Sequence, residues 1–327
     1  MVAGLIRQNQ FELALDHIAQ MRMKGIPIQN WLHGLIVYHL CEIEDFDEVL
    51  RQMDSRVQQG HDMSQYLWHY VLDAASEALH RKLTRFAWMR MVELGYLRAA
   101  YGTCRNTLTA AGREGDVQLA ASVFRYLEDI GISPEREDYE SMAEAHLMSG
   151  NLHSAFEVLC TMHKSGVELE GSSTRSVLTF MMMTKTAPRT AWNILKQLKL
   201  AGYDIPVDCA NVVLELCARN ALNDPSIVDE AITFYKELYS LCAGGANGPT
   251  YETLVSMCRR AVRRDAAMFI IKEMSALNVV PSDRVFEDII MMCLERNNFQ
   301  SAFHYFQDLT ERGGRLSEEN IVQIRNI

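Results

Sequence analysis

Residues 138–168 read DYESMAEAHLMSGNLHSAFEVLCTMHKSGVE, and this stretch decides the fold. Apolar residues recur at i, i+3, i+4 and i+7 on both sides of Ser149-Gly150-Asn151, which predicts two amphipathic helices joined by a tight turn. Gly166 then ends the second helix, because glycine tolerates the left-handed backbone that a helix end requires. One hairpin cannot bury both of its apolar faces, so the sequence predicts that it stacks against neighbours of the same kind.

The helix stop at Gly166 recurs every 35 or 36 residues, apart from one irregular interval after Gly202. The stop is occupied by Gly25, Gly60, Gly95, Gly131, Gly166, Gly202, Asn278 and Gly313. Eleven residues before these stops stands a small or short side chain, which lets two helices approach closely: Ala14, Val49, Thr84, Ala120, Ala155, Ala191, Ala267 and Ala302, with Ala231 in the irregular unit. The predicted fold is therefore an all-α, right-handed superhelical solenoid of tandem helix-turn-helix repeats of 35–36 residues.

The recurring helix stops and the recurring small residues together set the predicted repeat boundaries. The repeats are 30–64, 65–100, 101–135, 136–170, 171–206, 207–247, 248–282 and 283–317, with a partial repeat at 1–29 and the start of a further helix at 318–327. The repeat 207–247 is longer than the others, and its extended turn is either a flexible elbow or a sign of a degenerate repeat. Because the terminal units are incomplete, we expect the array to be part of a longer one.

Charge and cysteine usage narrow the function. The formal net charge of −10 lowers the odds of strong non-specific nucleic-acid binding, although a local basic stripe can suffice for RNA. None of the 8 cysteines forms a CxxC pair, and most fall on apolar helical positions. We interpret them as inert core thiols in a reducing compartment.

Motifs for catalysis are absent from the sequence. It has no phosphate-binding GxxxxGK[ST], no HExxH, no GxSxG and no cluster with metal-ligand spacing. We therefore predict a protein that is not an enzyme, with no cofactor, no metal and no small-molecule substrate. No apolar run is long enough to span a membrane, and the opening residues do not resemble a signal or transit peptide.

Several repeats resemble the pentatricopeptide repeat family. The relevant stretches are GREGDVQLAASVFRYLEDIGISPE in 101–135, the opening stretch in 136–170, TYETLVSMC and FIIKEMSALNVVPS in 248–282, and FEDIIMMCLERNNFQSAFHYFQDLTERG in 283–317. Tetratricopeptide repeats are 34 residues long and begin with a W-x₂-L-G-x₂-Y pattern that this chain lacks. The resemblance extends over nearly the whole chain.

The resemblance implies an organellar RNA-binding factor with a mitochondrial location. Its partner would be single-stranded RNA, either a mitochondrial transcript or ribosomal RNA, and its role would lie in transcript processing, stability or translation. The alternative is a protein-interaction scaffold on the mitochondrial ribosome or a translation-activator complex. Glutamates on the inner helix face and exposed methionines and aromatics favour that alternative.

Two positions of each repeat read the base in this family: the fifth residue of the first helix and the last residue of the repeat. The pairs here are Gly34 with Ser64, His69 with Ala99, Arg105 with Glu135, Glu140 with Glu170, Ser176 with Pro206, Asn211 with Ala246, Glu252 with Ser282, and Glu287 with Ser317. Productive pairs combine Asn, Ser or Thr with Asn or Asp, so Ser176 and Asn211 are the familiar first members.

Stacking and phosphate contacts complete the expected site. Trp31 and Tyr66 hold the second position, where a side chain packs on a base. The thirteenth position, which contacts phosphate in the family, holds Arg113, Arg219 and Arg260. Arg81, Lys82, Arg85 and Arg90 form one basic cluster, and Arg259, Arg260, Arg263 and Arg264 form another. Such runs are more often solvated helix faces than binding sites.

Overall fold

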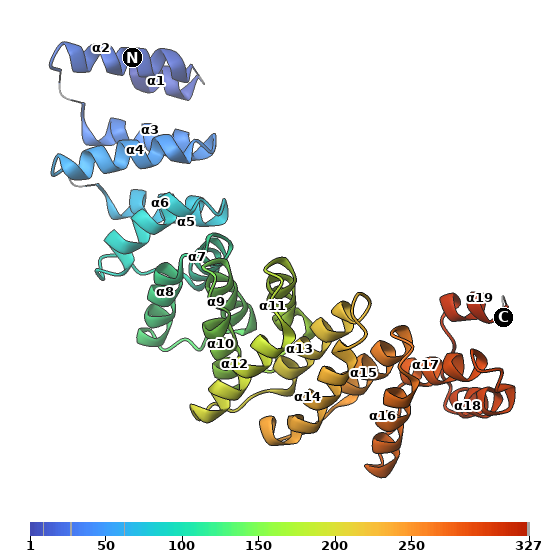
Figure 1. The fold of residues 1–327 in the computed structure, drawn as a ribbon. Helices are drawn as coiled ribbons and strands as arrows, with labels where there is room; N and C mark the ends of the chain where they lie inside the picture. The colour runs from blue at the N-terminus through green and yellow to red at the C-terminus, as the bar shows by residue number, and fades with distance from the viewer. Residues whose placement is uncertain (9, 27, 62, 326–327) are drawn as a thin grey trace. The chain divides into compact units, whose positions relative to one another are not determined.

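The structure is a computed structural model that describes residues 1–8, 10–26, 28–61 and 63–325. Within these ranges all regular secondary structure is helical, which confirms the predicted all-α fold of tandem helices (Figure 1). Positions 9 and 27 of the predicted partial repeat and 326–327 of the predicted last helix lie outside the described residues. The chain divides into two compact units, Met1–Asn151 and Leu152–Ile327.

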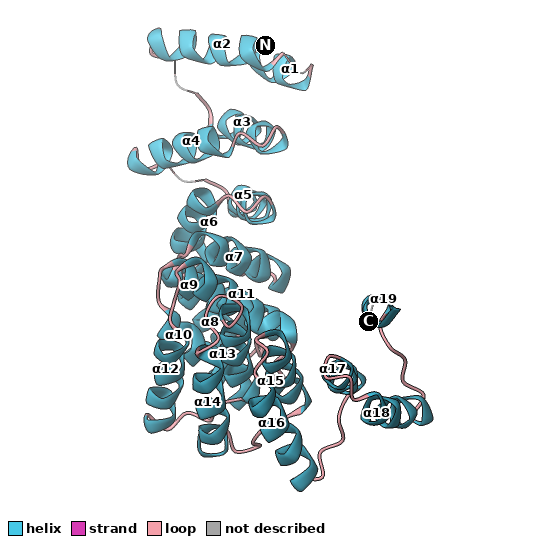
Figure 2. Cartoon of the chain, turned by 45° about the vertical axis from the view of Figure 1, so that its right-hand side comes forward, coloured by secondary structure: helices cyan, strands magenta, loops and turns pink. Residues whose placement is uncertain are grey.

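The N-terminal unit is a row of helical hairpins joined by short loops (Figure 2). Its first helices contact one another in chain order, and so do the second helices α4 and α6. The first helices are α1 (Val2–Arg7), α3 (Asn30–Glu42), α5 (Gln65–Glu77), α7 (Tyr101–Glu114) and α9 (Arg136–Met148). The second helices are α2 (Phe11–Met23), α4 (Phe46–Gln58), α6 (Arg81–Ala87), which continues as the π-helix η1 (Trp88–Val92), and α8 (Val117–Asp129).

The C-terminal unit repeats this arrangement. Neighbouring first helices contact one another from α11 to α19, and neighbouring second helices do so from α10 to α16. The first helices are α11 (Gly171–Met183), α13 (Val207–Asn220), α15 (Gly248–Arg260), α17 (Asp283–Leu294) and α19 (Glu318–Arg325). The second helices are α10 (Leu152–Lys164), α12 (Pro188–Leu200), α14 (Ile227–Leu241), α16 (Arg264–Ala276) and α18 (Phe299–Glu311). The hand in which the hairpins wind stays a prediction.

The predicted helix stops all have the backbone that the sequence argument requires. Gly25, Gly60, Gly95, Gly131, Gly166, Gly202 and Gly313 have a positive φ, and Asn278 shares it with a φ of 53°. The left-handed residue turns the chain away from the second helix and into the next hairpin. The spacing of the stops therefore sets the length of each hairpin.

The small residues that stand eleven positions before the helix stops, with Ala231 of the irregular unit, lie in the core. All nine of its members are at most 4% exposed: Ala14, Val49, Thr84, Ala120, Ala155, Ala191, Ala231, Ala267 and Ala302. Each predicted repeat interval holds one pair of helices, and the first helix begins at the first residue of the interval. In the long repeat the extended turn runs from 221 to 226, and Arg263 at the start of α16 donates a hydrogen bond to the Pro225 carbonyl (3.3 Å).

The cysteines behave as core residues. Seven of them are buried and Cys293 is half-buried, all as free thiols. Burial raises the pKa of Cys41, Cys104, Cys217, Cys242 and Cys258 to about 12. Because the thiolate is the reactive form, such thiols are poor nucleophiles at neutral pH.

Candidate nucleic-acid interface

The structure brings the two expected base-reading positions together. The last residue of each repeat immediately precedes the next first helix, and at three places it contacts the fifth residue of the preceding first helix. Side-chain contacts join Arg105 to Glu135, Asn211 to Asn247, and Glu287 to Ser317. We call each such meeting point a junction and name it by its two helices.

Counting from the N-caps shifts three of the sixteen expected positions by one residue. The N-cap of α11 is Glu170, so its fifth residue is Arg175, and the half-buried Ser176 follows it. The N-cap of α7 is Ala100 instead of Ala99, and that of α15 is Asn247 instead of Ala246. The predicted boundaries already end repeats at 100 and 247 and begin one at 171, so the three slips lie in the assignment of the pairs and not in the boundaries.

The α13–α15 junction is built from neutral amides. Asn211 Nδ2 donates to Asn247 Oδ1 (3.0 Å), and Asn211 Oδ1 accepts from the Thr250 hydroxyl (2.7 Å). Asn247 and Thr250 form a capping box at the start of α15, with Thr250 fully buried. Both asparagines are half-buried, and each keeps amide hydrogens that these bonds do not use. This junction can therefore offer donors and an acceptor to a base edge.

Cations lie toward the other end of the same two helices. A cavity of about 470 Å³ between α13 and α15 is lined by residues that include Arg219, Arg260 and Arg284. Arg219 is paired with Glu215 one turn earlier (2.7 Å). Arg260 and Arg284 are exposed and have no ion pair among the described residues. They also line a second cavity, of about 940 Å³, on the α17 side of α15.

The other arginines of the basic cluster at 259–264 pair with carboxylates on neighbouring helices. Arg263 makes two hydrogen bonds to the Asp229 carboxylate on α14 (3.0 and 2.5 Å), and these bonds lower the pKa of Asp229. Arg259 pairs with Asp288 (2.8 Å) on α17, and Arg264 lies 3.8 Å from Glu295. Of the four expected cations, Arg260 is the one whose charge no described carboxylate balances.

The α7–α9 junction has the same backbone geometry and the opposite chemistry. Arg105 forms ion pairs with Glu135 (4.0 Å) and with Glu137. The buried Asp138 accepts from the Tyr101 hydroxyl (2.7 Å) and from the Glu135 backbone N–H (2.8 Å). Burial and this hydrogen bond raise the pKa of Tyr101. At this junction the carboxylates of Glu135 and Glu137 therefore bind the cation at the fifth position, Arg105.

Arg113 lies near the end of α7. It is exposed and has no ion pair among the described residues. It therefore remains available to an anionic partner.

Exposed aromatic side chains mark α3 and α5. Trp31 is 59% exposed and Tyr66 is 83% exposed, each at the second residue of its helix. Trp31 and Gly34 line a cavity of about 570 Å³ between α3 and α5, and a Cβ at Gly34 would meet no atom within 4 Å. His69, half-buried on α5, holds the fifth position. This gap has room for a flat ring against Trp31.

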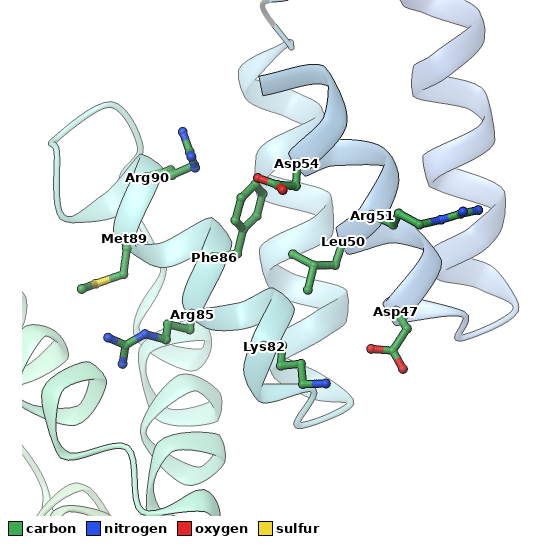
Figure 3. A pocket seen from close by; sticks show the side chains of 9 residues that line it. All are labelled: Asp47, Leu50, Arg51, Asp54, Lys82, Arg85, Phe86, Met89 and Arg90. Carbon is green, nitrogen blue, oxygen red and sulfur yellow. The ribbon is translucent and has the colours of Figure 1, made fainter. Parts of the chain in front are cut away.

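The basic cluster at 81–90 lies on second helices, away from the junctions. It borders a groove of about 530 Å³ between α4 and α6, where Leu50, Asp54 and Phe86 point into the gap (Figure 3). The Arg85 guanidinium points away from Leu50 and bonds to Asp116, the N-cap of α8 (2.6 Å to Oδ2). Arg90 lies 5.1 Å from the centre of the Phe86 ring.

Asn247 and Arg284 were missed as functional candidates by sequence reasoning. Asn247 carries a readable signal, because an Asn followed three residues later by Thr is a helix-start pattern. Arg284 stands at the second position of its repeat, as Trp31 and Tyr66 do, but only the packing of α17 beside α15 brings it to Arg260.

Metal and membrane sites are not found in the described residues. No group of three or more His, Cys, Asp or Glu side chains there is arranged to hold a metal ion. None of the described helices is both long enough and apolar enough to cross a membrane.

Residues 101–238 match a family model described as "Pentatricopeptide repeat-containing protein". This segment is similar to that family. The match includes Arg105, Asn211 and Arg219, and it confirms the resemblance over these residues. No curated protein gives a significant match.

Two solved structures of a pentatricopeptide repeat protein are also similar to the chain. The crystal structure of the protein PPR10 from maize has 14% identity and a TM-score of 0.40, and the match covers 99% of this chain and 54% of that one. The crystal structure of PPR10 in complex with an 18-nt psaJ RNA element has 13% identity and a TM-score of 0.36, with 98% and 56% covered. The chain thus spans about half the length of these proteins.

Proposed function

We propose that this chain is a non-catalytic pentatricopeptide-type module that binds single-stranded RNA along its first helices. The observation that carries the proposal is the α13–α15 gap. An amide pair, Asn211 with Asn247, lies where α15 begins, and the unbalanced cation Arg260 is the last residue of α15. Arg260 and Arg284 both line the cavity between α13 and α15. Asn211 and Arg219 are eight residues apart on α13, which is about 12 Å along a helix.

The two ends of the gap suit the two parts of a nucleotide. Asparagine amides hydrogen-bond base edges, because one side chain offers both a donor and an acceptor. Arginines attract phosphates, and each phosphate contact releases a counterion. A strand lying along the gap would place its bases toward Asn211 and its backbone toward Arg260.

The acidic total charge is compatible with this function. Many carboxylates are already paired, for example Asp229 with Arg263 and Asp288 with Arg259. Paired charges contribute little to the field beyond their neighbourhood. The cavity between α13 and α15 is lined by three arginines and two glutamates, so its lining carries a net positive charge.

The cellular role follows from the family resemblance alone. We place the protein in mitochondria, where it would act on a transcript or on ribosomal RNA in processing, stability or translation. Microscopy of the tagged protein in intact cells tests the location, and a cytosolic or nuclear signal would contradict it.

Binding to labelled RNA tests the proposed function. We expect fluorescence anisotropy to show micromolar or tighter binding to single-stranded RNA and weaker binding to a duplex of the same sequence. Arg260→Glu with Arg284→Glu should weaken binding by about 10- to 100-fold and reduce the magnitude of the salt slope by about 2.

Lys82→Glu with Arg90→Glu is the matched control, since it makes the same charge change in the α4–α6 groove. Its binding should fall far less. Equal losses in the two double variants would show that only net charge matters, and would contradict a site in the gap.

A protein-interaction scaffold on the mitochondrial ribosome or a translation-activator complex is the second candidate. The ion-paired α7–α9 junction favours it, because side chains that are already paired with one another leave few hydrogen-bonding groups for a base. If the chain bound no single-stranded RNA in the anisotropy experiment, this candidate would replace the first.

A further inference from the structure

The α4–α6 groove lies between two second helices that belong to neighbouring hairpins of the N-terminal unit. It has a volume of about 530 Å³, and the half-buried side chains of Leu50 and Phe86 point into it (Figure 3). Because both walls lie inside the array, a repeat added at either end of the chain would not fill the groove. The space is therefore open to another molecule.

The same place between α12 and α14 is closed by two large rings. Trp192 and Phe234 stack there with ring centres 4.5 Å apart, and both side chains are fully buried. Trp192 directly follows Ala191, the small buried residue of α12. Phe234 stands three residues after Ala231, the small buried residue of α14. Large side chains at these two positions fill the contact between neighbouring second helices.

Smaller side chains occupy the same two positions in α4 and α6. Leu50 directly follows Val49, the short buried residue of α4. Ala87 stands three residues after Thr84, the short buried residue of α6. A leucine and an alanine fill far less volume than a tryptophan and a phenylalanine. The two helices therefore leave a groove where α12 and α14 pack ring against ring.

The α6 wall of the groove ends in a π-helix. Met89 and Arg90 line the groove and belong to η1, in which the Glu93 N–H donates to the Trp88 carbonyl five residues back (3.1 Å). Turns of this kind are rare in proteins, and they occur frequently at functional sites. The helix is thus irregular at the place where it borders the groove.

Two cations stand along the α6 wall. Lys82 and Arg90 are exposed, and neither forms an ion pair among the residues that the structure describes. The Arg90 guanidinium lies 5.1 Å from the centre of the Phe86 ring. The two cations are eight residues apart, which is about 12 Å along a helix.

Carboxylates stand along the α4 wall at a similar spacing. Asp47 and Asp54 are seven residues apart, which is about 10 Å along the helix. Asp47 lies 3.5 Å from His80, and Asp54 accepts a hydrogen bond from Gln58 (2.6 Å). Neither carboxylate is paired with the two cations across the groove. The two walls therefore present opposite charges to a molecule that lies between them.

Each end of the groove has one charge of either sign. Lys82 and Asp47 lie toward one end, and Arg90 and Asp54 lie toward the other (Figure 3). A polyanion such as RNA would meet a carboxylate at both ends, and like charges that face each other are unfavourable. A protein segment with acidic residues on one side and basic residues on the other would match both walls.

We propose that the α4–α6 groove binds an amphipathic helix of a partner protein. The helix would lie along the groove with its apolar row on Leu50 and Phe86. Its acidic residues would face Lys82 and Arg90, and its basic residues would face the α4 wall. Helices bind in apolar grooves through residues at i, i+3, i+4 and i+7. Residues seven or eight apart on such a helix span the distance of about 10 to 12 Å between the charges of each wall.

Designed peptides test the proposal in fluorescence anisotropy with the 327-residue chain. The mixed peptide has about 18 residues, or five helical turns, with a row of leucines between a row of glutamates and a row of lysines. It should bind with a dissociation constant on the order of 10 to 100 µM, as expected of a small site. Peptides whose flanking rows are all glutamate or all lysine should each bind at least about fivefold more weakly.

Two results with the wild-type chain would overturn the proposal. One is the absence of binding of the mixed peptide up to about 500 µM. The other is equal binding of the mixed peptide and either single-charge peptide, because the two walls would then play no part.

Leu50→Glu tests the apolar floor of the groove. It should weaken binding of the mixed peptide at least about tenfold, because it places a charge against the leucine row. Leu94→Glu is the matched control, since Leu94 is 64% exposed just after η1 and does not line the groove. Equal losses in the two variants would contradict binding in the groove.

Swapping charges across the groove tests the two walls without a change in net charge, and it replaces Leu50→Glu if that variant loses helical content. Asp54→Lys with Arg90→Glu reverses one end, so neither direction of the peptide helix matches both ends. Binding should fall at least about fivefold. Adding Asp47→Lys with Lys82→Glu reverses the other end, and the peptide should bind again after turning end to end. Binding that the first swap leaves unchanged would overturn the proposal, and so would a loss that the second swap does not restore.

RNA binding is measured separately. The residues that line the groove and those that line the cavity between α13 and α15 do not overlap. The outcome for the peptides therefore leaves the proposed function untouched.

Discussion

The α7–α9 and α13–α15 junctions have the same backbone design and different chemistry. In both, a capping residue starts the second of two first helices and touches the fifth residue of the one before. Arg105 is paired with two glutamates at α7–α9, whereas Asn211 and Asn247 keep unused amide hydrogens at α13–α15. Repeat geometry alone therefore does not make a binding site. The two side chains at the junction decide whether the repeat has donors and acceptors available to hydrogen-bond a base.

The largest effect should come from removing Asp138 at the α7–α9 junction. Asp138→Ala deprives the Tyr101 hydroxyl and the Glu135 backbone N–H of their acceptor in a buried setting. We expect the free energy of unfolding to fall by about 2 to 3 kcal/mol, measured by urea denaturation followed by circular dichroism. Glu128→Ala, at an exposed position of α8, is the control and should change little. A loss below about 0.5 kcal/mol would show that this junction is not held by its carboxylate.

A smaller loss is expected at the α13–α15 junction. Thr250→Val keeps the shape of a fully buried side chain and removes its hydrogen bonds to Asn211 and Asn247. The free energy of unfolding should fall by about 1 to 2 kcal/mol in the same assay. Thr253→Val, one turn further along α15, serves for comparison and should cost clearly less. If the two variants were equally stable, the hydroxyl network would not hold the junction.

Transferring the amide pair tests whether chemistry alone separates the two junctions. Arg105→Asn with Glu135→Asn gives α7–α9 the side chains of α13–α15. We expect RNA affinity to rise about fivefold, or roughly 1 kcal/mol, as measured by anisotropy. The double alanine variant at the same positions removes the ion pair without supplying amides, and its affinity should rise less. Both variants leave the net charge unchanged, so an equal rise would mean that loss of the Arg105–Glu135 ion pair, and not base contact, explains the gain.

The smallest expected effect is on the loss of folding stability at acid pH. Burial alone would raise the pKa of Asp116, but hydrogen bonds from Arg85 and from the Leu119 backbone hold it below 3.8. A carboxyl group whose pKa is lower in the folded than in the unfolded state stabilises the fold at any pH above its unfolded-state pKa. This stabilisation is lost as the pH falls through the folded-state pKa. Urea denaturation between pH 6 and pH 3 should therefore show a decline that is shallower in Asp116→Asn. The same decline in both proteins would assign the acid sensitivity to other groups.

The sequence predicted the fold because the fold depends on spacing. Gly25, Gly60 and the other stops end helices by their own backbone preference, and small residues such as Ala155 mark the contact within each hairpin. These are local properties that recur, so their period can be read along the chain.

The candidate site was only partly readable. Asn211 follows from position, and Asn247 is the last residue of the predicted repeat 207–247. Only the structure shows that Asn247 is the N-cap of α15 and bonds to Asn211. The pairing of Arg263 with Asp229 and the meeting of Arg260 with Arg284 depend on how α14, α15 and α17 pack. No pattern within one helix records such contacts.

Crosslinking of the chain to single-stranded RNA that contains 4-thiouridine tests the central claim most directly. Mass spectrometry of the crosslinked peptides should place the base contacts in the segments around Asn211 and Asn247, with few or none around Arg105 and Glu135. Crosslinks concentrated at α7–α9, or confined to the α4–α6 groove, would contradict a site at the α13–α15 junction.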